Sequence, residues 1–387
     1  MKSSRLPLRI VTVATALAAV LAFALPASAA PLVLNAGAVL TLTGSNQAFG
    51  LSSRRGIDMA VKEINAGAIS GIKMSVKTVD DAGTVPGAAA AFGIFFRDEV
   101  SAILGPTLSS VALNVDPFAN GARIPVLGIS NSLPGITEIG TFVFRPALTE
   151  AIVLPRVVKA VATSSAQPKS AVLIVGSDAA VSVDSYSATA SAIMGQALTD
   201  NGIVTTKTIA VPADTTDYSS IGADVKLTNP AIVAITALPG EGIPLIVALR
   251  AAGFRGKIIG SNAFNSQEII SAAKAASNGL IVGTAWSPAT VTVRNKAFIK
   301  AFRKEYKRLP DQYAATGYAY TYVLAQAAKN GNSTSQTAMQ TQLAAITGDK
   351  FVSTLLGKFR FDANRNGVSP VAIQEVINQH FMIYQPK

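Results

Sequence analysis

Cysteine is absent from this chain of 387 residues, and histidine occurs once, as His380. Without cysteine the protein has no disulfide bond, no thiolate nucleophile and no zinc-thiolate site. The sequence also lacks the common catalytic and nucleotide-binding motifs: it has no Walker phosphate loop, no HExxH, no GxSxG and no GxGxxG after an apolar run. A lone histidine in a strand-like run is more often packed or exposed than a general base. These absences argue against an enzyme and against a bound metal or cofactor.

Long apolar runs are also absent, with one exception near the start of the sequence. Residues 10–25 are mostly apolar; they follow Lys2, Arg5 and Arg9 and precede a short stretch of proline, alanine and serine. This order is typical of a secretory signal peptide, for which we expect cleavage near Ala29. A transmembrane anchor would need roughly 20 apolar residues. We therefore expect a protein exported to the periplasm, and the lack of cysteine excludes attachment through a lipidated N-terminus.

Acidic residues are fewer than basic ones, 22 against 33, which gives a formal net charge of +11. Loss of the signal peptide would remove three basic residues and leave +8. Proteins that bind nucleic acid cluster Lys and Arg with interleaved aromatic residues on one element. The comparable group here, within residues 294–308, fits the solvated outer face of an amphipathic helix. We therefore expect no nucleic-acid partner, and a mild positive field that attracts anionic ligands.

Short apolar runs alternate with helical patterns along the rest of the chain. Such alternation predicts parallel sheets covered by helices, and the chain is longer than one hydrophobic core usually serves. We therefore predict an α/β protein with two Rossmann-like lobes, each a parallel-type sheet flanked by helices. The expected strands are residues 33–42, 72–79, 100–104, 171–175, 203–211, 231–237, 257–260, 280–284, 358–361 and 373–383. The expected helices include residues 50–65, 87–97, 110–120, 149–162, 184–201 and a helix after Pro244.

Small hydroxyl residues follow two neighbouring apolar runs. Ser109 and Ser110 come after the run that ends at Leu104, and Ser130 and Ser132 come after the next run. In an open parallel sheet, ligands bind outside the carboxyl ends of the strands, where loop amides and helix N-termini meet. Simple N-capping of a helix explains Ser109 and Ser110 equally well. The two loops together favour a site for a carboxylate, formed by hydroxyl and N–H groups without an arginine.

Several short motifs occur in a specific order and spacing. They are Leu42-Thr43-Gly44 with Gly50, residues 56–65 (GIDMAVKEIN), residues 79–83 (VDDAG), Gly105-Pro106 with Ser109, Asp217-Tyr218-Ser219, and Tyr313 to Tyr318 after Pro310. In this order the motifs resemble those of the periplasmic binding proteins of ABC transporters, specifically the branched-chain amino acid receptor family. The resemblance covers nearly the whole chain after the signal peptide.

The resemblance implies a fold, a role and partners. The fold would be the type I, two-lobed Venus-flytrap fold, with residues 30–149 and 288–356 in lobe 1 and residues 150–287 and 357–387 in lobe 2. The role would be capture of a small molecule by lobe closure. We expect a monomer that delivers its ligand to an ABC permease and ATPase subunits at the inner membrane. A ligand-sensing receptor of the same fold, which feeds a regulator or a receptor kinase, is the alternative.

The resemblance also implies roles for single residues. Ser109 matches the position that binds the ligand carboxylate, helped by the loop that holds Ser130 and Ser132. Phe49 falls where the family often has an aromatic residue that covers the ligand. Tyr186 falls in the clamp of the second lobe, after a stretch several residues longer than usual. These positions are the expected ligand-binding site.

The main departure from the family concerns the ligand amine. Amino acid binders place an acidic residue two positions after the glycine that ends the run 257–260, and this chain has Asn262 there. The loop that often adds a tyrosine contains Leu238. A buried ammonium without a carboxylate partner is costly, although Glu241 from the neighbouring loop is an alternative partner. We therefore expect a small carboxylate, either branched-chain amino acid-like or an aromatic or aliphatic acid without an amine.

Overall fold

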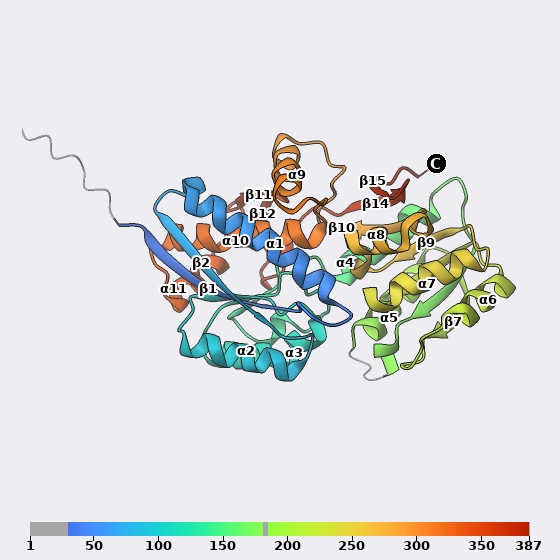
Figure 1. Ribbon diagram of the computed structural model, residues 1–387, viewed down its shortest axis with the longest axis horizontal. Coiled ribbons are helices and arrows are strands. Elements are labelled where there is room, and N and C mark those ends of the chain that lie inside the picture. Colours follow the sequence, from blue (N-terminus) through green and yellow to red (C-terminus); the bar gives the residue numbers. More distant parts are fainter. Residues whose placement is uncertain (1–29, 181–184, 387) are drawn as a thin grey trace, which may run out of the picture. The chain divides into compact units, whose positions relative to one another are not determined.

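The fold is described for residues 30–180 and 185–386 in a computed structural model of the chain (Figure 1). The expected signal peptide and the first residue of the helix expected at 184–201 lie outside these residues. Contacts group Pro31–Lys387 into one compact unit. Within the described ranges, no helix has the length and apolar character needed to cross a membrane.

The N-terminal part of the chain forms a five-stranded parallel sheet in the order β2-β1-β3-β4-β5. Its elements are β1 (Leu32–Leu40), α1 (Gln47–Glu63), β2 (Ile72–Asp80), α2 (Val85–Arg97), β3 (Ala102–Leu104), α3 (Ser109–Gly121), β4 (Val126–Leu127) and β5 (Val143–Phe144). Along β1, Leu34 and Ala38 pack in one core with α1, while Val39 packs in another with α2 and α3. Helices thus cover both faces of the sheet, which explains why its strands are apolar runs (Figure 1).

A seven-stranded sheet follows, in the order β15-β14-β10-β9-β8-β6-β7. Its strands are β6 (Ser170–Val175), β7 (Val204–Ala210), β8 (Ile232–Thr236), β9 (Lys257–Gly260), β10 (Leu280–Thr284), β14 (Ala372–Ile377) and β15 (His380–Ile383). Its helices are α4 (Glu150–Ala162), α5 (Tyr186–Asp200), α6 (Ser219–Thr228), α7 (Pro239–Ala251) and α8 (Gln267–Ala273). Strands β6 to β10 pair in parallel, and β14 and β15 add antiparallel strands at one edge. The predicted α/β class with parallel-type sheets is confirmed.

The segment between β10 and β14 packs with the first sheet. It contains α9 (Val293–Tyr306), α10 (Gln312–Gly331), α11 (Gln336–Ala344) and a small antiparallel sheet of β11 (Val352–Thr354), β12 (Gly357–Phe361) and β13 (Gly367–Val368). Phe359 and Phe361 in β12 are buried in the core that holds α1, α10 and one face of the first sheet. The sequence placed residues after 356 with the second lobe. The buried aromatic residues of β12 draw this strand to the first sheet instead, while the lobe limits as a whole stay a prediction.

The remaining short helices are η1 (Ile64–Ala68), η2 (Thr137–Ile139), η3 (Ser177–Ala180), η4 (Asn262–Phe264) and η5 (Lys274–Ser277). One predicted helix start is wrong: α7 begins at Pro239, not after Pro244. Both prolines fit near a helix start, but the first helical position is where the missing N–H and the fixed φ angle of proline are best tolerated. The earlier start places the N-terminus of α7 directly after Leu238.

Candidate functional site

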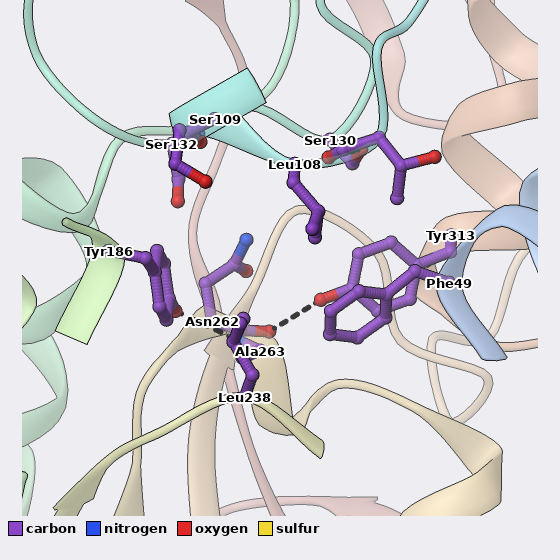
Figure 2. Close-up of a pocket in the computed structure, with 12 residues that line it drawn as sticks. Phe49, Leu108, Ser109, Ser130, Ser132, Tyr186, Leu238, Asn262, Ala263 and Tyr313 are labelled. Atoms are coloured by element: carbon purple, nitrogen blue, oxygen red, sulfur yellow. Dashed lines mark hydrogen bonds between the residues drawn. The ribbon is translucent and has the colours of Figure 1, made fainter. Parts of the chain in front are cut away.

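A small cavity lies where loops after the strands of the first sheet approach loops of the second sheet (Figure 2). Its volume is about 30 Å³, which is room for about two or three ordered waters at about 10–15 Å³ each, so in this conformation the cavity is too small for a ligand of more than a few heavy atoms. It is lined by Phe49, Thr107, Leu108, Ser109, Ser110, Ser130, Ser132, Tyr186, Leu238, Asn262, Ala263 and Tyr313. The structure thus brings together the expected ligand-binding residues Phe49, Ser109, Ser130, Ser132, Tyr186, Leu238 and Asn262, and their role in binding stays a prediction. The described residues of this lining include no Asp, Glu, Lys, Arg or His.

The serines form one wall of the cavity. Ser109 is the first residue of α3, and Leu108 is its N-cap without a side-chain hydrogen bond, so the N-capping interpretation of the serines is wrong. Ser109 Oγ instead accepts the backbone N–H of Ser132 at 3.1 Å, and Ser130 Oγ donates to the carbonyl of Thr107 at 2.7 Å. These bonds join the two loops. The first amides of α3, which have no acceptor within the helix, remain available to a ligand, and beside them lies the Ser132 hydroxyl, which donates to Glu150 Oε1 at 3.4 Å.

Aromatic rings form the opposite wall (Figure 2). Phe49 and Tyr313 lie with their ring centroids 4.5 Å apart, and the Tyr313 hydroxyl donates to the carbonyl of Asn262 at 3.0 Å. The sequence singled out Phe49 but gave Tyr313 no role beyond its place in a motif. Tyr313 lies in the first turn of α10, about 260 residues away in sequence from Phe49, so the pairing depends on the close packing of α1 and α10. The two rings, tilted by 41° to each other, present an apolar surface to any ligand.

The orientation of the Asn262 side chain is set by hydrogen bonds that end on the backbone. The N–H of Ala285 donates to Gln312 Oε1 at 2.9 Å, so Gln312 Nε2 is the group that donates to Asn262 Oδ1 at 3.0 Å. Asn265 Nδ2 donates both to the carbonyl of Gly283 and to Asn262 Oδ1, at 2.7 and 3.1 Å. The oxygen of Asn262 is therefore occupied by two donors. Its NH₂ group points toward the serine wall (Figure 2).

A buried acid, Glu150, lies behind the lining and was missed by the sequence reasoning. Its Oε1 accepts hydrogen bonds from the Tyr186 hydroxyl at 2.6 Å, the Asn262 N–H at 3.1 Å and the Ser132 hydroxyl at 3.4 Å. The side chain is fully buried, and this burial raises the pKa of Glu150 to about 7 against the opposing effect of those hydrogen bonds. Glu150 lies in the first turn of α4, where an acidic residue is normally explained by its favourable interaction with the helix dipole. Its position in the sequence therefore gave no sign that it contacts residues of the cavity.

Glu241, the alternative ammonium partner from the sequence, is not among the residues that line the cavity. Its carboxylate accepts the backbone N–H of Ser177 at 3.0 Å and also the Ser177 hydroxyl. Glu241 thus fixes the start of η3 to the first turn of α7. In this conformation the carboxylate oxygens of Glu241 accept hydrogen bonds from Ser177, in a loop of the second sheet.

Two α/β sheets and a compact, uncharged cavity at the carboxyl ends of their strands define the class: a protein that binds a small solute. The chain belongs to the periplasmic binding protein family, which it matches over residues 33–380. The family is one of solute-binding proteins, not enzymes, and implies an extracytoplasmic location. The family resemblance deduced from the sequence motifs is confirmed.

Relatives and solved structures agree with this assignment. The chain is 26% identical over 357 residues to the Leu/Ile/Val-binding protein BraC3 of Rhizobium johnstonii, an alignment that covers 90% of this chain and 92% of the relative. This chain is similar in structure to the branched-chain amino acid transporter substrate-binding protein LivJ of Streptococcus pneumoniae, whose crystal structure is in complex with isoleucine. The TM-score is 0.81 at 21% identity, and the match covers 92% of this chain and 100% of the LivJ chain. A solute-binding protein from R. palustris in complex with benzoate has a TM-score of 0.80 at 20% identity, with 91% and 95% covered. At these identities the structures establish the shared fold.

Proposed function

We propose that this protein captures a small carboxylate that lacks an α-amine and delivers it to the permease of an ABC importer. The observation that carries the proposal is the direction of the Asn262 amide. Its oxygen accepts from Gln312 and Asn265, so the group turned toward the serine wall is a hydrogen-bond donor. A donor complements a carboxylate oxygen and does not complement an ammonium.

The rest of the lining supports the same ligand class. The first amides of α3 and the hydroxyl of Ser132 add donors on the serine wall, and helix N-termini favour anions. Phe49 and Tyr313 offer apolar surface to an aromatic or aliphatic body. In the described residues no acidic side chain lines the cavity, and a buried ammonium without such a partner is costly. Structural neighbours with isoleucine and with benzoate show that the fold accommodates both ligand classes.

Delivery would follow from closure of the two lobes around the ligand. Ser109 and Ser132 come from loops of the first sheet, while Tyr186, Leu238 and Asn262 come from loops of the second. A ligand that contacts residues from both sheets stabilises the closed state relative to the open state. Only this difference in affinity for the two states shifts the equilibrium between them. The closed, loaded protein in the periplasm would then be the form that the permease recognises.

The ligand test compares matched pairs that differ only in the amine. The chain without residues 1–29 is melted with leucine or 4-methylpentanoate, and with phenylalanine or 3-phenylpropanoate, with benzoate as a further acid. A ligand at 100 times its Kd stabilises the native state by about 2.7 kcal/mol, which a thermal shift detects. We expect a shift from the amine-free acids. A shift from the amino acids alone would show that the ligand class is wrong.

Delivery is tested in cells. A strain that lacks this protein is expected to lose uptake of the acid that gave the largest thermal shift, and to regain it when the protein is restored. Normal uptake in the deleted strain, with binding confirmed in vitro, would contradict the role in import.

A further inference from the structure

Glu150 connects the serine wall to loops of the second sheet, directly behind the cavity. One oxygen, Oε1, receives the hydroxyl groups of Ser132 and Tyr186 and the N–H of Asn262. All three donors belong to residues that line the cavity. The side chain of Glu150 itself has no exposed surface. Any change in its charge is therefore transmitted to the ligand through these residues.

The hydroxyl of Ser132 has a single proton to donate. In the structure that proton is directed to Glu150 Oε1. A ligand carboxylate that accepts the same proton would leave Glu150 with one donor fewer. It would also place a second negative charge near a buried carboxylate, with only the Ser132 hydroxyl between them. Both changes disfavour the ionised form of Glu150.

We infer that Glu150 takes up one proton from solvent when the ligand binds, an inference that rests on the proposed carboxylate ligand. The protonated Glu150 donates to Ser132 Oγ, and Ser132 donates its own proton to the ligand carboxylate. The direction of the Glu150–Ser132 hydrogen bond is reversed, and one bound proton accompanies each bound anion.

The surroundings of Glu150 support this exchange. In the described part of the chain, the titratable groups coupled to it are Tyr186 from α5 and Tyr313 from α10, and burial raises the pKa of both phenols well above its usual value. Both tyrosines stay neutral near pH 7. No charged group acts on Glu150 from the Ser132 loop or from η4 among the described residues. Its pKa of about 7 in the free protein leaves it poised to accept a proton under ordinary conditions.

The inference predicts a defined pH dependence. Where Glu150 is ionised in the free protein and protonated in the complex, affinity falls tenfold for each pH unit. With a free pKa of about 7, the linkage gives binding roughly tenfold weaker at pH 8 than at pH 6, and an uptake of about 0.8 proton at pH 7.5.

Calorimetry measures the uptake directly. Benzoate and 4-methylpentanoate are titrated into the protein at pH 7.5 in phosphate and in Tris, whose ionisation enthalpies differ, so that the difference in binding heat gives the number of protons. Glu150→Gln supplies a permanently neutral group whose amide oxygen can accept from Tyr186 and Asn262 in place of Glu150 Oε1. We expect this variant to bind without proton uptake and with an affinity that does not vary between pH 6 and pH 8. Asp116→Asn removes another buried acid, on α3 and outside the cavity lining, and is expected to keep the uptake.

The outcomes separate this inference from the proposed function. Binding of either acid with no proton uptake, and with the same pH profile in Glu150→Gln as in the wild type, would refute the role of Glu150 and leave the ligand class intact. Failure of every amine-free acid to bind at pH 6 would refute the proposed function itself. Binding of leucine that is abolished by Glu150→Gln would identify Glu150 as an ammonium partner and overturn both.

Discussion

Substitution of Asn262 by aspartate tests the basis of the ligand assignment with a change of one atom. One oxygen of an aspartate at this position would accept from Gln312 and Asn265, as Asn262 Oδ1 does now at 3.0 and 3.1 Å. The second oxygen would take the place of the NH₂ group that points toward the serine wall. The local fold is preserved, while a donor aimed at the ligand becomes a charged acceptor.

The magnitude follows from two losses. A hydrogen bond to a charged partner contributes about 1.5–3 kcal/mol. Two like charges about 4 Å apart repel by about 4 kcal/mol at an effective dielectric constant of about 20. Even if relaxation removes half of the repulsion, binding of a carboxylate is expected to weaken by at least 3 kcal/mol, or roughly 100-fold. An α-amino acid should bind more tightly to this variant than to the wild type.

Isothermal titration with 4-methylpentanoate and with leucine measures both effects on the same protein. Asn330→Asp is the matched control because Asn330 is exposed, lies outside the cavity lining, and accepts from Gln326 through an oxygen that aspartate retains. This control changes the net charge equally and is expected to leave both affinities as they are. Equal carboxylate affinity in Asn262→Asp and wild type would refute the assigned direction of the Asn262 amide.

Three further predictions concern the serine wall and the stability of the fold. Ser109→Ala and Ser132→Ala should each weaken carboxylate binding by about 1–3 kcal/mol in calorimetry, since each removes a hydroxyl from a buried polar cluster. Asp116→Asn should raise the free energy of unfolding at pH 7, measured in urea, because burial without a hydrogen-bond partner raises the pKa of Asp116. Because the pKa of Asp116 is higher in the folded state than in the unfolded state, the wild type loses stability as pH rises through that range. The gain in stability from Asp116→Asn should therefore shrink toward pH 4. Gly56→Ala should lower the free energy of unfolding by about 1–3 kcal/mol, because a Cβ there would lie 2.0 Å from a backbone carbonyl oxygen of α10. Gly93→Ala, with its nearest neighbouring atom 3.8 Å away, should be neutral or stabilising.

Each of these predictions has a clear contrary result. Unchanged affinity in both serine variants would remove the serine wall from the site. A gain in Asp116→Asn that grows toward low pH would show that the carboxyl is stabilised in its ionised form. Equal unfolding curves for Gly56→Ala and Gly93→Ala would show that α1 and α10 separate at little cost.

The sequence alone was sufficient for the features that depend on local order. Alternating apolar runs and helical patterns determined the α/β class, and the expected strands 257–260 and 280–284 coincide with β9 and β10. Ser109 was found because the carboxyl ends of parallel strands meet at one edge of a sheet, so residues just after a strand are placed by topology. Asn262 was singled out by the family resemblance, as a departure from the acidic residue of amino acid binders. The start of α7 was misplaced because its two prolines give the same local signal.

Tertiary structure decided everything that depends on contacts between distant segments. Glu150 and Asn262 are 112 residues apart, and only the approach of α4 to the loop after β9 makes them hydrogen-bond partners. The sequence showed an asparagine at position 262, but the direction of its amide depends on Gln312, which α10 brings from 50 residues away. A side chain's identity is local, whereas its orientation and protonation depend on the groups packed around it. For this protein those groups determine whether the site offers the ligand a donor or an acceptor.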